Sequence, residues 1–119
     1  MSRFLIHIHS GPATPNTATL GCTVALAAAN EGHETVIFFA GDGVHLLSPD
    51  HGGTEGQGTG RISELLPALK EAGVRFYLSG KSAKARGYDD SLLQGHPAAF
   101  AMPPKLVALA AEAETVLCY

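Results

Sequence analysis

The 119-residue sequence is poor in cysteine, in positive charge and in long hydrophobic runs. Its 8 lysine and arginine residues are outnumbered by 11 acidic ones, and the resulting net charge of −3 argues against a general nucleic-acid or membrane-surface binder. No apolar run approaches the ~20 residues that a membrane span needs. The N-terminal segment enters a predicted strand directly and lacks the apolar core and cleavage site of a signal peptide. We therefore expect a soluble, cytoplasmic protein.

The two cysteines, Cys22 and Cys118, are far apart and lie in apolar surroundings. Two cysteines without metal-type spacing are more often small core residues than a disulfide or a pair of metal ligands. His45, His51 and Glu55 lie near one another in the sequence, but their spacing matches no standard metal site. We therefore assign no metal and no cofactor.

The length favours one domain over residues 1–119 that buries about two thirds of its unfolded surface. Runs rich in aromatic and β-branched residues predict strands, at 4–9, 34–40, 74–78, 98–101 and 115–119. Periodic segments between them predict helices, mainly at 17–31, 64–72 and 103–112. Because strands alternate with helices, we expect a parallel sheet that helices cover on both faces.

Two of these helices carry side-chain predictions. In the alanine-rich helix 17–31, the stripe expected to face the sheet consists of Leu20, Val24, Ala27 and Ala28. Cys22 then points away from the sheet, and an apolar outer face suggests a subunit contact. In the helix 64–72, Ser63 is the expected N-cap, and the apolar stripe consists of Leu65, Leu66 and Leu69.

Residues 48–60 form a glycine-rich segment, with five glycines between positions 51 and 60. Glycine loses the most conformational entropy on ordering, so a regular element is costly here. The glycine spacing matches neither a phosphate-binding loop nor a dinucleotide fingerprint. We predict a flexible loop, which is either a mobile lid or a disordered surface loop.

Candidate ligand-binding residues follow three of the predicted strands. His9 ends the first, Asp42 follows the second, and the turn from Ser79 to Arg86 follows the third. Since ligands bind at the carboxyl ends of parallel strands, we expect the three to converge on one edge of the sheet. Asp42 either caps the next turn or accepts a hydrogen bond from a ligand or from nearby cations. His7, in mid-strand, is expected to be a satisfied core histidine.

The turn after the third strand breaks a local rule of helix chemistry. Ser79 can cap a short helix, and Gly80 allows a ligand to approach the backbone. Lys81, Lys84 and Arg86 are then expected to crowd the positive end of the helix dipole, where acidic residues are usual. A rule broken in this way often marks a functional site.

The expected function of this turn is the binding of a small anion. Ser82 and Arg86 lie one helical turn apart and can hold an oxyanion together with Lys81 and the backbone N–H groups. The alternative is that Arg86 pairs with Asp89 or Asp90 and that the lysines are merely solvated.

Two motifs carry a family resemblance: Phe38-Phe39-Ala40-Gly41-Asp42-Gly43-Val44, and Ser79-Gly80-Lys81-Ser82-Ala83-Lys84-Ala85-Arg86-Gly87. With Ala72-Gly73-Val74 and Ala113-Glu114-Thr115-Val116-Leu117, they resemble the DsrE/DsrF-like family of small sulfur-relay proteins, in its YchN-like branch. The resemblance implies one three-layer α/β/α domain with a five-stranded parallel sheet, flavodoxin-like in appearance. It also implies a homo-oligomer, trimeric or hexameric, that works in sulfur trafficking with sulfur-relay proteins as partners.

The sequence departs from the family where sulfur is handled. In sulfur-handling members the turn looks like Cys-Gly-x-Cys-x-x-Ala-Arg-Gly, whereas here both cysteine positions are serine, Ser79 and Ser82. Sulfur relay requires a thiolate, so we predict a non-catalytic, oligomeric binding or accessory member, or a purely structural subunit of a hetero-oligomer. The enzymatic alternatives are a sulfurtransferase that uses Cys22 and a hydrolase in which His9 or His96 activates Ser82. No Gly-x-Ser-x-Gly elbow supports the hydrolase.

Overall fold

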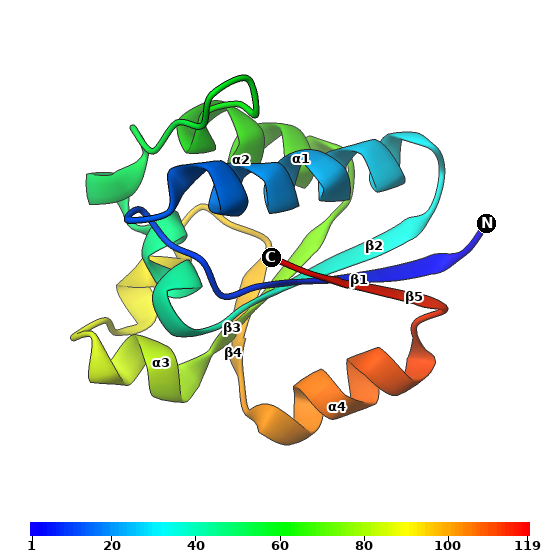
Figure 1. Cartoon of the computed structure of the whole chain (residues 1–119). Coiled ribbons are helices and arrows are strands. Elements are labelled where there is room, and N and C mark those ends of the chain that lie inside the picture. Colours follow the sequence, from blue (N-terminus) through cyan, green and yellow to red (C-terminus); the bar gives the residue numbers. More distant parts are fainter.

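In the computed structural model, which describes residues 1–119, five strands form one parallel sheet in the order β4-β3-β2-β1-β5 (Figure 1). The strands are β1 Arg3–Ile8, β2 Glu34–Phe39, β3 Arg75–Ser79, β4 Ala98–Ala101 and β5 Thr115–Cys118. All five predicted strands are therefore present, with ends displaced by one residue or so.

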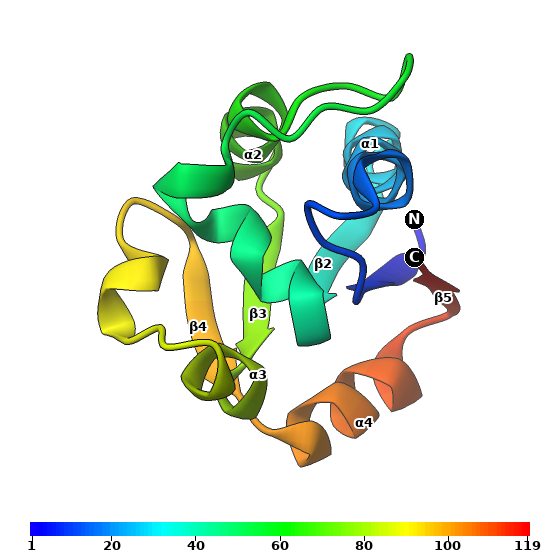
Figure 2. The ribbon, with the colours of Figure 1, turned by 60° about the vertical axis from the view of Figure 1, so that its left-hand side comes forward.

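Helices lie on both faces of the sheet (Figure 2). One face is covered by α1 Pro15–Asn30 and α2 Ile62–Glu71, and the other by α3 Gly80–Ala85 and α4 Pro103–Glu112. Three short 3-10 helices complete the chain: η1 Gly41–Leu47, η2 Pro49–His51 and η3 Asp90–Leu93. The expected three-layer α/β/α architecture is confirmed. None of the helices has both the length and the apolarity needed to cross a membrane.

The main core lies between the sheet and the α1/α2 layer. Alternate strand residues point into it, because side chains of a strand alternate between the two faces. Ile6, Ile37 and Phe76 are neighbours in register and are almost fully buried. Phe39 packs edge-on against Phe76, with ring centroids 5.5 Å apart. By contrast, α4 contributes no buried residue to the opposite face.

The prediction for the sheet-facing side of α1 is wrong. The helix turns Cys22 and other small residues toward the sheet, while Leu20 is 39% exposed. Of the four residues predicted to face the sheet, only Ala28 is buried. The reason is close packing: a Cβ on Gly21 would lie 2.9 Å from Ile8 Cδ1, so only small side chains fit between α1 and the sheet.

The prediction for α2 is half right. Leu65, Leu66 and Leu69 are buried as expected. The helix begins earlier than predicted, at Ile62, so Ser63 lies inside the first turn and does not act as the N-cap. The N-cap position is occupied by Arg61, which makes no capping bond through its side chain.

The glycine-rich segment 48–60 lies against the N-terminal half of α1. Thr59 Oγ1 is 2.7 Å from Thr19 Oγ1, and the Thr59 carbonyl accepts a hydrogen bond of 2.6 Å from Thr23 Oγ1. Glu55, in the middle of the segment, forms an ion pair with Arg61, the residue that follows the segment. These contacts attach the segment to the domain, and its flexibility stays a prediction.

Candidate functional site

The segments that follow β2 and β3 meet at the carboxyl edge of the sheet. The Gly41 N–H donates a 2.9 Å hydrogen bond to Ser82 Oγ, and Arg86 forms an ion pair with Asp42. A Cβ on Gly41 would lie 4.0 Å from His9 Cβ, so the end of β1 lies beside the same segment. The expected convergence of the three segments is confirmed.

Both serines of the turn use their hydroxyls to hold the structure. Ser79 is the N-cap of α3, and its Oγ accepts a 3.1 Å hydrogen bond from the Ser82 N–H, as predicted. The Ser82 hydroxyl accepts from Gly41 and so connects the start of α3 to the segment after β2. Ala83, the next residue, is almost fully buried, so packing against the core also holds the turn in place.

Arg86 lies at the opposite end of α3 from the position expected for it. The helix has only six residues, so Arg86 is its C-cap and Lys84 lies in the last turn. The guanidinium donates from Nε to Asp42 Oδ1 at 3.1 Å and from Nη1 to the Ser82 carbonyl at 3.1 Å, and its Nη2 lies 3.0 Å from the same Oδ1 in the ion pair. The predicted crowding of three cations at the positive end of the helix is therefore wrong. Only Lys81 is near that end.

The ion pair of Arg86 shows which of the roles expected for Asp42, and for Asp89 or Asp90, is correct. Asp42 accepts from the cation cluster, and the cap of the following 3-10 helix is Ala40, so the capping role of Asp42 is wrong. The alternative in which Arg86 pairs with Asp89 or Asp90 is also wrong, because its partner is Asp42. Asp89 instead accepts hydrogen bonds from the Ser91 hydroxyl and N–H, which lower the pKa of Asp89.

Arg86 keeps free N–H donors at the surface while it is paired with Asp42. A guanidinium has five N–H donors, and the contacts with Asp42 and the Ser82 carbonyl occupy at most three of them, which leaves at least one on Nη1 and one on Nη2. The side chains of Arg86 and Asp42 are 30% and 62% exposed, so their ion pair contributes at most about 1 kcal/mol to stability. Lys81 and Lys84 are exposed nearby on α3. The ligand-binding role of these residues stays a prediction.

The structure adds a histidine–tyrosine pair that the sequence does not reveal. His45 Nδ1 lies 2.6 Å from Tyr88 Oη, and the ring of His51 packs 5.3 Å from that of His45. Burial lowers the pKa of His45; the nearby His51 lowers it further, while Asp42 opposes the shift. No local signal predicts a contact between residues 43 positions apart.

The end of β1 carries a second histidine pair. His7 and His9 lie on the same side of the strand, as predicted, with ring centroids 5.6 Å apart. His7 is half-buried and its Nε2 has no hydrogen-bond partner, so the prediction of a satisfied core histidine is wrong. Burial and the neighbouring His9 lower the pKa of His7. His7 is paired in register with Cys118, which is exposed.

The enzymatic alternatives gain no support from the geometry. Cys22 is fully buried, and burial raises the pKa of its thiol to about 12, so it carries almost no thiolate near neutral pH. The Ser82 hydroxyl has no hydrogen bond to a histidine, which a serine nucleophile requires for activation. No group of three metal-ligating side chains converges in the fold.

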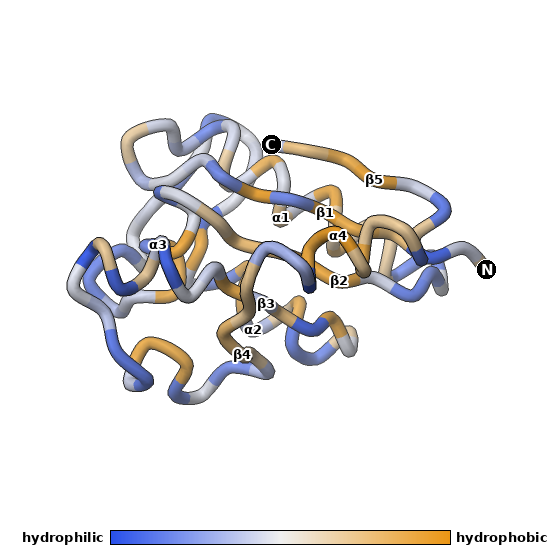
Figure 3. Tube along the Cα trace, turned by 90° about the horizontal axis from the view of Figure 1, so that it is seen from below, coloured by the Kyte–Doolittle hydropathy of each residue, from blue (hydrophilic) through white to orange (hydrophobic).

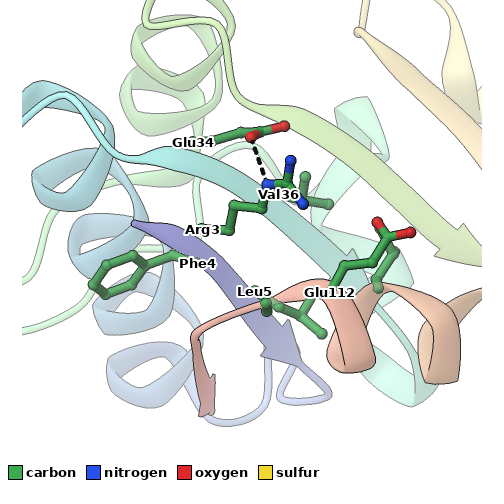
Figure 4. A pocket seen from close by; sticks show the side chains of 8 residues that line it. Arg3, Phe4, Leu5, Glu34, Val36 and Glu112 are labelled. Atoms are coloured by element: carbon green, nitrogen blue, oxygen red, sulfur yellow. Dashed lines mark hydrogen bonds and ion pairs between the residues drawn. The ribbon is translucent and has the colours of Figure 1, made fainter. Parts of the chain in front are cut away.

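A pocket of about 310 Å³ lies at the other end of the sheet, between the strands and α4 (Figure 4). Leu5, Val36 and Leu109 form its apolar part, and the Arg3–Glu34 ion pair of 3.1 Å borders it. Arg3 and Glu34 begin β1 and β2, so the pocket is far from the carboxyl edge and from all predicted site residues.

Comparison with known proteins gives a family model and related folds. The model described as DsrE/DsrF-like family matches residues 2–119. The crystal structure of ychN protein from E. coli is 17% identical, with full coverage of both chains and a TM-score of 0.81. The conserved protein of unknown function BT1422 from Bacteroides thetaiotaomicron is 14% identical over 98% of this chain and 94% of its own, with a TM-score of 0.68. A search of the curated proteins found no match.

Proposed function

Because the chain belongs to the DsrE/DsrF-like family, which is generally linked to sulfur relay, we propose that it is a non-catalytic, oligomeric accessory member in intracellular sulfur trafficking. Its ligand is a small anion that binds at the turn after β3. The observation that carries the proposal is the use of both serine hydroxyls of this turn as hydrogen-bond acceptors within the fold.

The hydroxyls support a non-catalytic role for a chemical reason. A sulfur carrier needs a polarisable thiolate, and a serine hydroxyl cannot form a persulfide. Ser79 and Ser82 instead stabilise the turn through two hydrogen bonds of 3.1 and 2.9 Å. The fold of the turn is thus maintained without the reactive atom.

Anion binding is supported by the charges that remain available at the turn. Arg86 is held by Asp42 and the Ser82 carbonyl, and this orientation still leaves two guanidinium N–H donors. Lys81 and Lys84 add positive charge on the exposed side of α3. An oxyanion such as sulfate, sulfite or phosphate suits a guanidinium and two ammonium groups.

The test is calorimetric titration of the protein with sulfate, sulfite and phosphate. R86Q should weaken the binding of the preferred anion at least tenfold, since it removes a charge-assisted donor of about 1.5–3 kcal/mol. R61Q is the matched control, because Arg61 is also an exposed arginine paired with a carboxylate, that of Glu55. Equal affinities for wild type and R86Q, or no binding of any of the three anions, would contradict the proposed anion site.

The oligomeric part of the proposal has its own measurement. Light scattering on the purified chain should give a mass of three or six protomers, as the family resemblance implies. A monomer that assembles only after addition of sulfur-relay proteins would favour a subunit of a hetero-oligomer instead.

A further inference from the structure

Two side-chain pairs join η1 to the segment at the end of α3. In the first, Asp42 of η1 pairs with Arg86, the C-cap of α3. In the second, His45 Nδ1 lies 2.6 Å from Tyr88 Oη. Asp42 and His45 are three residues apart in a 3-10 helix, where side chains at that spacing lie on the same side. The imidazole of His45 is therefore a neighbour of the ion pair at Arg86.

The segment that carries Arg86 and Tyr88 is itself held in place. The Tyr88 N–H donates a 3.0 Å hydrogen bond to the Ala83 carbonyl of α3, and Ala83 is almost fully buried. Arg86 is exposed, and the side chains of His45 and Tyr88 are partly exposed, so a solute can reach this group of residues. Figure 3 shows hydrophilic positions along α3 beside them.

The charged and titratable groups around His45 come from three segments. Asp42 precedes it on η1, and Arg86 and Tyr88 face it from the end of α3. The ring of His51 on η2 packs 5.3 Å from the His45 ring. Burial lowers the pKa of His45 most, and His51 comes next; Asp42 opposes this shift, whereas Arg86 reinforces it. Without a ligand, the imidazole is therefore neutral near pH 7.

The contact with Tyr88 suits both charge states of the imidazole. A tyrosine hydroxyl can donate to Nδ1 of the neutral ring, or it can accept from Nδ1–H of the protonated ring. His45 can therefore gain a proton while it keeps its partner. A bound anion supplies the reason to gain one, because negative charge beside Arg86 opposes the effect of the guanidinium on His45 and favours the charged form of the ring.

We propose that His45 is a further residue of the anion site, and that an oxyanion bound at Arg86 is held also by the protonated imidazole of His45. The inference rests on the proposed anion site and adds its regulation, since each anion then binds together with a proton. Anion and proton strengthen each other's binding by the same factor, because coupling between two sites is reciprocal. The affinity for the anion should therefore rise as the pH falls through the range in which histidines titrate.

The test measures the affinity for sulfate by calorimetry at about pH 7.5 and pH 5.5, where mainly histidines change their charge. Sulfate is the probe because it keeps both negative charges over this range. Wild type should bind at least about threefold more tightly at the lower pH, and H45Q should lose this increase. H33Q is the matched control and should keep the increase, because His33 lies at the other end of the sheet, where its Nδ1 accepts from the Ser2 N–H. Circular dichroism at both pH values establishes that the three proteins are folded.

Nuclear magnetic resonance of the histidine rings provides a measurement specific to His45. The signal that is missing in H45Q identifies the residue, and saturating sulfate should move its titration midpoint to higher pH while that of His33 stays in place. Equal sulfate affinities of wild type at the two pH values, the same increase in H45Q, or an unmoved midpoint of His45 would each overturn the inference. The titration of R86Q then still decides on the anion site itself.

Absence of sulfate binding at both pH values would overturn the inference as well. The titrations with sulfite and phosphate would in that case decide whether the anion site stands.

Discussion

The reactivity of Cys22 offers a quantitative test of the site assignment. C118S leaves Cys22 as the only thiol in the chain, so a chromogenic disulfide reagent reports on it alone. With a pKa of about 12, Cys22 is ionised to about one part in ten thousand at about pH 8, whereas an ordinary thiol is about one quarter ionised. The resulting ratio is roughly 2,500-fold. A more basic thiolate is the stronger nucleophile, which offsets this ratio by roughly 40-fold. Cys22 should therefore react about 60-fold more slowly than an ordinary thiol on account of its pKa alone.

Lack of access for the reagent limits the reaction more strongly than this factor does. Cys22 has no exposed surface, so the reagent must wait for an opening of the core, and such openings cost about 5 kcal/mol or more in a stable domain. We therefore expect C118S to react at least about a thousandfold more slowly than C22S, in which Cys118 is the exposed thiol. In concentrated guanidinium chloride the two variants should react alike. Reaction of native C118S within tenfold of the rate of C22S would refute the reasoning and restore Cys22 as a candidate sulfur carrier.

Three further predictions concern the carboxyl edge and its histidines. S82C in a C118S background should react with the same reagent faster than C22S does, because the Gly41 N–H and the cations of α3 favour a thiolate; an equal or slower rate would contradict this. G43A should lower the free energy of unfolding by about 3 kcal/mol in urea denaturation, because its Cβ would lie 2.4 Å from the Ile8 carbonyl oxygen, whereas G53A, with open space around it, should change little. The fold lowers the pKa values of His7, His45 and His96. The unfolded chain therefore binds more protons than the folded chain below about pH 6.5, and the free energy of unfolding should decrease as the pH falls through that value. H45Q should reduce this pH dependence, and a free energy of unfolding that stays constant between about pH 7.5 and 5.5 would count against the prediction.

The sequence predicts the strands well because their signal is local. The central residues of β2 and β3 are the apolar runs 36–39 and 76–78, and a buried parallel strand has that composition. The same signal fails for α1, which has apolar residues on all sides and no charge to mark the solvent face. There the size of the side chain decides the orientation. The helix turns its small residues, including Cys22, to the closely packed sheet and leaves the larger Leu20 outside.

The sequence predicts which segments meet at the candidate site, but not which side chains pair with one another there. Parallel topology places Asp42 and the Ser79–Arg86 turn on one edge, and the sequence alone implies that. The identity of the Arg86 partner depends on where a six-residue helix ends, and a shift of a few residues changes which carboxylate is in reach. The pair of His45 and Tyr88 depends on the positions of two loops, and neither loop carries a local signal of the other.

The carboxyl edge also suggests why the turn survives without a thiol. Ser82 accepts from the Gly41 N–H and Arg86 pairs with Asp42, so two contacts connect α3 to the segment after β2, and the bond from Arg86 to the Ser82 carbonyl holds Arg86 against α3. A buried or half-buried backbone N–H needs an acceptor, and a hydroxyl fills that role more strongly than a thiol, which is a weak acceptor. Serine at the position where the resemblance implies a cysteine therefore provides the stronger acceptor in the connection that positions Arg86. This connection is the basis of the proposed role, in which the turn binds an anion and does not transfer sulfur.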